Sequence, residues 1–183
     1  MKEEYNDYTI RLADPKEYHR LGEMTVQAYQ SLPGMPGPKE QTEYYAMLKD
    51  VAGRATQPSI EIWAAVDKDS NVLGGITFVG DMAEYNSGGS AGSQTDCAGV
   101  RLLAVKPEAR GKGVGRALTL ACIQRAKEIG RSLVVLHTTK SMETAWRLYQ
   151  SMGFVRSPNL DFEQGRLEVY GFSLPIEQKG ERI

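Results

Sequence analysis

Hydrophobic positions along the first half of the chain recur with two different periods. Apolar residues return every three or four positions over residues 15–32 and 39–55, which predicts two helices. Shorter segments that alternate or run apolar predict three strands, at residues 8–12, 60–66 and 72–79. A polar turn joins the last two strands and favours a hairpin. The first half therefore reads as strand, two helices and a β-hairpin.

The second half alternates regularly between strand and helix patterns. Strands are predicted at residues 99–105, 133–136, 154–155 and 167–174, and helices at 113–129 and 141–152. This order, with apolar strands between helices, is typical of an α/β sheet covered on both faces. Together with the hairpin it predicts a mixed sheet of about seven strands flanked by about four helices. At 183 residues, the chain is expected to form a single domain over residues 1–183.

Composition excludes some partners. The net charge is −1, so no basic surface is expected to attract nucleic acid or an anionic membrane. No apolar run is long enough to cross a bilayer, and the N-terminus lacks an apolar signal core, so we expect a soluble cytoplasmic protein. Cys97 and Cys122 are far apart and lack metal-ligand spacing, so we expect two reduced structural thiols and no metal site.

A turn rich in glycine and basic residues follows the strand predicted at residues 99–105. Glycines at alternate positions let the backbone approach an anion closely, and the first N–H groups of the following helix lack partners. The helix dipole adds partial positive charge. The residues concerned are Arg110, Gly111, Lys112, Gly113, Val114, Gly115 and Arg116. They predict a diphosphate site, the alternative being a tight connection with incidental glycines.

Two nucleotide patterns fit this turn poorly. No Gly-Lys-Ser or Gly-Lys-Thr occurs, so the turn is not a triphosphatase P-loop. The dinucleotide fingerprint needs a third glycine where Arg116 stands, and no acidic residue follows the strand at 133–136 to bind a ribose. A nicotinamide-dependent oxidoreductase therefore stays open only as a third possibility.

The chain resembles the GNAT superfamily of acyl-CoA-dependent N-acyltransferases. The family motif Arg/Gln-x-x-Gly-x-Gly/Ala matches residues 110–115, and Ala-x-x-Leu-Tyr-x-x-x-Gly-Phe matches residues 145–154. Both motifs occur in the family's order. The resemblance implies a GNAT-like sheet that is splayed at its central parallel strands, with acetyl-CoA as acyl donor.

The resemblance also implies roles for individual residues. The coenzyme A pyrophosphate would rest on the backbone of residues 110–116, and the pantetheine arm would pair with the strand that ends at Val105. Further cofactor contacts are implied for Leu103, Ala104, Val105, Ala145 and Leu148. Tyr149 stands at the motif position of the family's general acid. A phenol is protonated at neutral pH and so has a proton to donate. Tyr149 also lies on a helical stripe with Ala145 and Met152, so simple packing is the alternative.

Two positions depart from the family pattern. Gly99 stands where many members carry a glutamate base, and Met142 stands where many carry an asparagine. No base can therefore be carried over. Asp96 is the nearest carboxylate and a weak candidate for the substrate site, although a solvated loop residue is the simpler interpretation. His137 is either a proton shuttle or a hydrogen-bonded structural residue.

The resulting hypothesis is an N-acetyltransferase that acts on a primary amine of a small molecule or protein by direct attack in a ternary complex. A non-catalytic acyl-CoA sensor or scaffold is the alternative, motivated by Gly99 and Met142. The resemblance implies an acceptor pocket formed by the first two helices and by the loops at residues 33–38, 84–96 and 159–165. Asp96, Asp161 and Glu163 there would favour a cationic amine, although solvated loop carboxylates are the simpler interpretation. The resemblance also implies a homodimer through the C-terminal strands, which no residue pattern indicates.

Overall fold

The computed structural model describes residues 2–5 and 7–177, and a mixed sheet runs through its whole length. Within these residues the strands are β1 (Lys2–Glu4), β2 (Tyr8–Leu12), β3 (Ile60–Asp67), β4 (Val72–Val79), β5 (Cys97–Val105), β6 (Leu133–Thr138), β7 (Val155–Arg156), β8 (Phe162–Gln164) and β9 (Leu167–Pro175). Their spatial order is β1-β2-β3-β4-β5-β6-β9-β7, and β8 pairs with β9. Only β5 and β6 pair in parallel. The strand–helix–strand unit expected in the second half is therefore the one parallel crossover.

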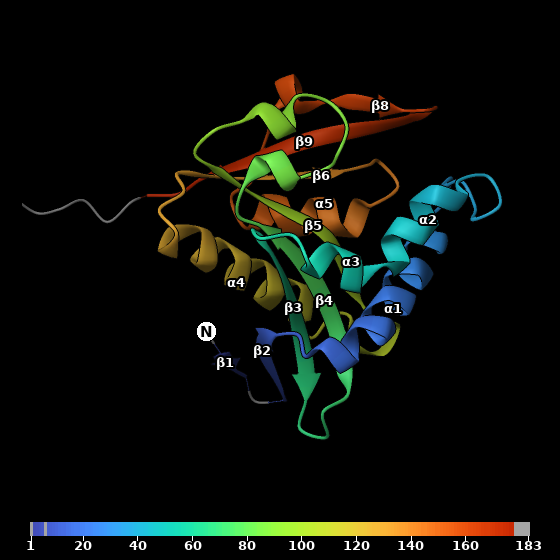
Figure 1. Ribbon diagram of the computed structural model, residues 1–183, viewed down its shortest axis with the longest axis vertical. Helices are drawn as coiled ribbons and strands as arrows, with labels where there is room; N and C mark the ends of the chain where they lie inside the picture. The colour runs from blue at the N-terminus through green and yellow to red at the C-terminus, as the bar shows by residue number, and fades with distance from the viewer. Residues whose placement is uncertain (1, 6, 178–183) are drawn as a thin grey trace, which may run out of the picture.

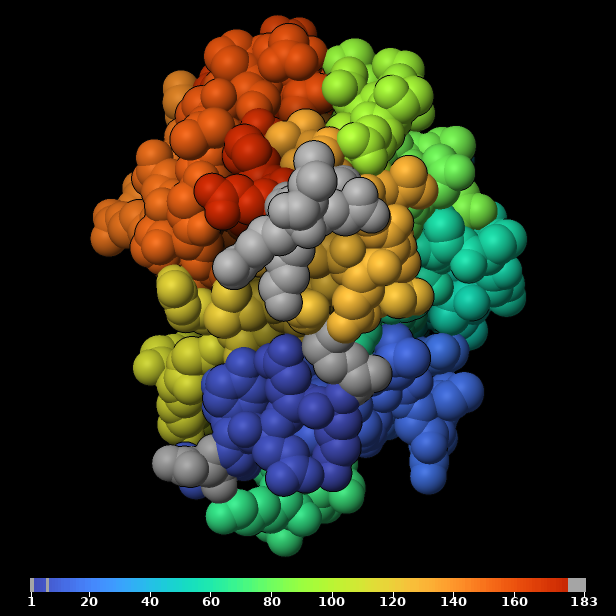
Figure 2. Space-filling model, turned by 90° about the vertical axis from the view of Figure 1, so that its left-hand side faces the viewer, coloured from blue at the N-terminus to red at the C-terminus, as the bar shows by residue number. Residues whose placement is uncertain are grey.

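Helices cover both faces of this sheet (Figure 1). They are α1 (Tyr18–Gln30), α2 (Thr42–Lys49), α3 (Val51–Ala55), α4 (Val114–Glu128) and α5 (Glu143–Ser151), with 3-10 turns at Pro15–Glu17, Met82–Glu84, Ala91–Ser93, Pro107–Ala109 and Pro158–Leu160. On β3, Trp63 and Ala65 pack in the core with α4 and α5, whereas Ile62 and Ala64 pack with α1. Figure 2 shows α4 crossing one face between the N-terminal strands and the C-terminal third. In the described part of the chain, no helix is both long and apolar enough to span a bilayer.

The expected α/β fold with a mixed sheet is confirmed, and the differences are local. The sheet has nine strands instead of about seven in the described residues, because β1 and β8 have three residues each and leave no periodic signal. The single helix predicted at residues 39–55 is wrong. Asp50, with ψ 71°, separates α2 from α3, and its carboxylate accepts the Gly53 N–H at 2.8 Å as the N-cap of α3.

The central parallel strands part half-way along their length, as the resemblance implied. β5 and β6 pair from Cys97 opposite Leu133 to Val100 opposite Leu136 and no further. Just beyond, Leu102 has φ +55°, and the register of β5 against β4 shifts at this point. This bulge turns β5 away from β6. The end of β5 therefore presents backbone groups without a partner strand on the β6 side.

Candidate functional site

A cavity of about 600 Å³ lies where β5 and β6 part. The end of α1, the second half of β5, the turn before α4, the end of β6 and one side of α5 form its walls. Every one of these segments is held by the sheet or packs on its core, so the cavity follows from the topology. Residues of the glycine turn line this cavity, and so do Tyr149 and His137.

The glycine turn has the backbone shape that an anion site requires. Gly111 has φ +74° and Gly113, the N-cap of α4, has φ +82°, values that favour glycine. No side chain caps the helix, so its first N–H groups are available to a ligand. Arg110 and Arg116 are exposed beside these groups and line the cavity. The turn therefore fits a diphosphate, with backbone donors and cations on the same side.

Tyr149 projects from α5 into the same cavity. Its ring is 6% exposed and packs edge-to-face on Phe154, with the ring centroids 5.7 Å apart. Burial, and then the nearby tyrosines Tyr29 and Tyr85, raise the pKa of the Tyr149 phenol well above its usual value. The hydroxyl has no hydrogen-bond partner within residues 2–5 and 7–177. A proton donor is thus held in the cavity with its hydrogen free.

The structure brings together most of the residues singled out in the sequence. Besides Tyr149, the cavity is lined by Leu103, Ala104, Val105, Arg110, Gly111, Gly113, Val114, Gly115, Arg116, Ala145 and Leu148. Lys112 is exposed next to the cavity and does not line it, and its carbonyl accepts a 3.4 Å hydrogen bond from the Tyr8 hydroxyl. The cofactor-binding roles of these lining residues and of Lys112 stay predictions.

Asp96 lies elsewhere. It is exposed and precedes β5 at the end of the strand where β5 and β6 are still paired, and its carbonyl accepts the Ser132 N–H at 3.1 Å. The cavity begins four residues later, at Val100. This position gives no support to the substrate role expected for Asp96.

Comparison with known proteins agrees with this geometry. The family model described as "Acetyltransferase (GNAT) family" matches residues 23–154. The chain belongs to this GNAT family. A mycothiol acetyltransferase of Thermobispora bispora is 44% identical over 57 residues, which are 31% of this chain and 19% of that protein. The match thus spans about a fifth of the relative's length.

Two further proteins match more of this chain, one in sequence and one in structure. The uncharacterized N-acetyltransferase YjgM of Escherichia coli is 30% identical over 99 residues, covering 54% of this chain and 53% of YjgM. The solved structure of yncA from Salmonella typhimurium, with its cofactor acetyl-CoA, has a TM-score of 0.65 at 20% identity and covers 96% of this chain and 98% of that one. At that identity the structural match shows the shared fold.

The departure from the GNAT pattern at Gly99 has a structural counterpart. The Tyr85 ring lies directly over Gly99 and fills the space that a side chain there would need. The Tyr85 hydroxyl is 3.0 Å from Nδ1 of His137, and Nε2 of His137 is 2.8 Å from the Leu160 carbonyl. Because a carbonyl only accepts, Nε2 donates and Nδ1 accepts from Tyr85. Burial lowers the pKa of His137, which favours this neutral, fully bonded form.

Sequence reasoning missed one further residue of this region. Arg101 lines the large cavity and also an adjoining cavity of about 70 Å³. A lone arginine within the apolar strand CAGVRLLAV was a signal for it. The tyrosines around it, Tyr29, Tyr44 and Tyr85, come from separate segments and gave no joint signal.

Proposed function

We propose that this GNAT protein transfers the acetyl group of acetyl-CoA to an amine, with Tyr149 as general acid. The observation that carries the proposal is the placement of Tyr149. Its buried, protonated phenol has no hydrogen-bond partner among the described residues and lines the same cavity as the glycine turn. The family and the neighbouring structure with acetyl-CoA support the same donor. The mycothiol acetyltransferases support acetyl transfer as the reaction type.

The binding part of the proposal rests on the walls of the cavity. The pyrophosphate lies on the backbone of residues 110–116, with Arg110 and Arg116 as counter-charges. The pantetheine amides pair with the end of β5, which has no partner strand on its β6 side after Val100. Leu148 closes the cavity opposite Gly115, whose absent side chain leaves room for the ligand.

The chemical step uses few protein groups. The neutral amine attacks the thioester carbonyl, a C–N bond forms, the C–S bond breaks, and Tyr149 gives its proton to the departing sulfur. We assign stabilisation of the developing oxyanion to a backbone N–H group near Leu103 on the β6 side of β5, a contribution of about 3–4 kcal/mol for one such donor in other enzymes. The amine loses its proton to solvent, and solvent returns a proton to Tyr149. No carboxylate at position 99 takes part.

A non-catalytic acyl-CoA-binding protein is the second candidate. The absence of a glutamate at Gly99 and of an asparagine at Met142 favours it. Such a protein would bind acetyl-CoA without releasing coenzyme A in the presence of any amine.

Calorimetric titration and a thiol-release assay test the proposal together. Acetyl-CoA and coenzyme A are expected to bind, NAD is not, and coenzyme A thiol is expected to accumulate with at least one member of a broad amine panel. Binding without thiol release across the panel would favour the sensor. Binding of NAD in competition with acetyl-CoA would overturn the assignment of the turn.

A further inference from the structure

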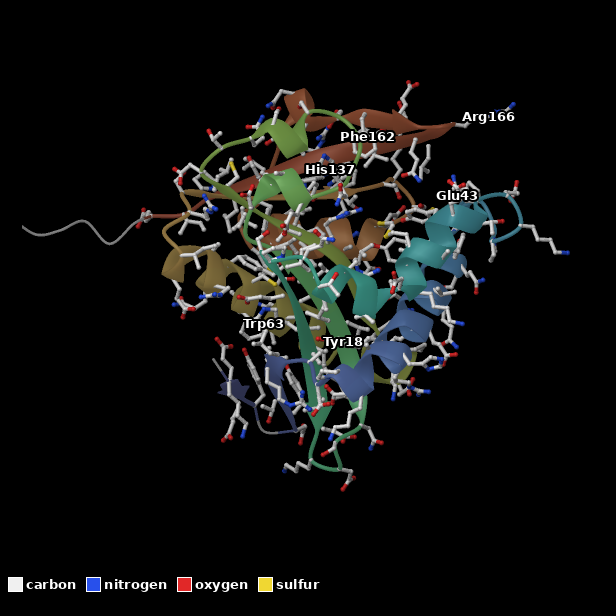
Figure 3. All side chains as sticks on the ribbon, viewed as in Figure 1. Tyr18, Glu43, Trp63, His137, Phe162 and Arg166 are labelled. Atoms are coloured by element: carbon white, nitrogen blue, oxygen red, sulfur yellow. The ribbon has the colours of Figure 1, made fainter. Side chains whose placement is uncertain are left out.

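The smaller cavity next to the acetyl-CoA cavity is built mainly from aromatic and apolar side chains. It shares residues of β5 and β6 with the large cavity and lies on the side of α2 and β8. Tyr29, Tyr44, Tyr85 and Phe162 line it, and Phe162 packs edge-to-face on His137 at 5.2 Å between centroids (Figure 3). This position adjoins the point where the strands part and the cavity that Tyr149 lines.

Arg101 is a charged group of this pocket, and it has no acidic partner among the described residues. Its guanidinium lies 5.2 Å from the centre of the Tyr85 ring and donates to the Tyr85 carbonyl oxygen. Three other half-buried arginines pair with carboxylates at 2.7–2.8 Å: Arg11 with Glu17, Arg125 with Glu61, and Arg156 with Asp161. Arg54 and Arg131, like Arg101, donate to backbone carbonyls, and neither lines the smaller cavity. Among the described residues Arg101 has no such ion pair, so its charge is left half-buried and uncompensated.

The lining of both cavities contains no aspartate or glutamate among residues 2–5 and 7–177. The carboxylates that the sequence offered for a cationic acceptor lie elsewhere: Asp161 is paired with Arg156, and Glu163 is exposed on β8 outside the lining. Burial, then Arg101 and Arg156, lower the pKa of His137, and the Leu160 carbonyl and Asp161 oppose them. The field in the pocket is therefore positive and disfavours an acceptor with additional cationic groups.

Neutral donors face the same space. Burial raises the pKa of the Tyr29 phenol to about 12, and it raises that of Tyr44 further, so both stay protonated at neutral pH. Neither hydroxyl has a hydrogen-bond partner in the described part of the chain. The pocket thus offers a guanidinium and two O–H donors, and its lining contains no carboxylate among the described residues.

We propose that the acceptor is an amine that also carries a carboxylate, as amino acids do, and that Arg101 binds this carboxylate. The inference rests on the proposed function for the role of the cavity as an acceptor site. The planar guanidinium matches a carboxylate through two parallel hydrogen bonds. Tyr29 and Tyr44 supply further donors to the anion, and the aromatic walls exclude water around the pair. Arg101 directly follows Val100, so the bound amine is held beside the point where the strands part.

Binding of reaction products tests the inference without relying on turnover. N-acetyl derivatives of amino acids with apolar, polar and charged side chains are titrated by calorimetry into protein saturated with coenzyme A, each beside its carboxamide and its decarboxylated analogue. The best-bound carboxylate is expected to bind about 10- to 100-fold more tightly than its carboxamide, the range for a hydrogen bond to a charged group. Arg101→Met is expected to abolish this difference, and Arg101→Lys to restore part of it.

Arg131→Met is the matched control. Arg131 is also half-buried and donates to a backbone carbonyl, that of Gly80 at 3.0 Å, but lines neither cavity. Equal binding of acid and amide, no binding of any carboxylate, or an equal loss of both ligands in Arg101→Met would overturn the inference. Thiol release from acetyl-CoA with the same amines separates the two proposals. Carboxylate-selective binding without release would remove the enzyme function and leave the Arg101 site.

Discussion

The Tyr85 ring fills the space above Gly99: a Cβ atom at position 99 would overlap the Cδ2 atom of Tyr85 and press on the Met82 sulfur. Tyr85 is 1% exposed and its hydroxyl is bonded to His137, so the ring has no room to move aside. The same packing leaves no room for the glutamate that many GNAT members carry at this position. An acidic side chain at position 99 and the Tyr85–His137 pair exclude one another.

This relationship predicts that Gly99→Ala destabilises the fold. Overpacking of a well-filled core costs about 1–3 kcal/mol, and the free energy of unfolding in urea is expected to fall by that amount. Gly92→Ala is the control, because a Cβ there makes only an ordinary 3.5 Å contact with the Met82 carbonyl. An unchanged midpoint and slope for Gly99→Ala would mean that the Tyr85 ring is not fixed in this place.

A second prediction concerns the glycine turn. Gly113→Ala and Gly130→Ala each place a Cβ on a residue in the left-handed region, with φ +82° and +74°, at opposite ends of α4. Both are expected to lose about 1–2 kcal/mol of stability, the cost of that conformation. Only Gly113→Ala is expected to weaken acetyl-CoA binding as well, by about tenfold, because the backbone there approaches the anion. Calorimetry on both variants checks this, and equal affinities would remove the turn from the site.

A third prediction follows from the Arg156–Asp161 pair. Two hydrogen bonds of 2.7 and 2.8 Å from Arg156, and another from the Gly171 N–H, lower the pKa of Asp161. A lowered folded-state pKa gives stability that is present above the unfolded value, near 4, and is lost as the pH falls through the folded value. Asp161→Asn is expected to cost about 1–3 kcal/mol at pH 7 and much less at pH 2.

Urea unfolding at both pH values measures this difference, with Asp69→Asn in the exposed β3–β4 turn as the control. A loss of stability in Asp161→Asn that is the same at pH 2 and pH 7 would show that the ion pair contributes nothing. The pair also matters for the smaller cavity, because it keeps the Asp161 charge engaged by Arg156 and outside the lining.

The features readable from the sequence are those encoded within one element or one turn. The glycine turn and Tyr149 lie in short motifs. The cavity that both line is formed mainly by elements of the second half, whose order of strands and helices was predicted from the sequence. The break at Asp50 was missed because the helical spacing of apolar residues continues across it, while the cap depends on a single carboxylate bonding Gly53. Propensity alone does not distinguish this from a continuous helix.

The smaller cavity was predicted only in part. Met35, Ser87 and Phe162 of the three loops named from the sequence line it, whereas Arg101 was missed because the contacts that place it join distant segments. Tyr85 and His137, which share a hydrogen bond, are 52 positions apart in the sequence. Arg101 is 16 positions from Tyr85 and contacts its backbone carbonyl and the face of its ring. No periodic pattern records such contacts. Asp96 was close in sequence to the motif strand, but the strand direction places it at the opposite end from the cavity.

The central claim, that Tyr149 donates the proton to the leaving thiol, is tested most directly by Tyr149→Phe. The substitution keeps the ring against Phe154 and removes only the hydroxyl, and Tyr18→Phe on α1, far from His137 in Figure 3, is the control. With the fastest amine of the panel, kcat is expected to fall about 10²- to 10⁴-fold while the Kd of acetyl-CoA is unchanged. Wild-type turnover in Tyr149→Phe would contradict the account.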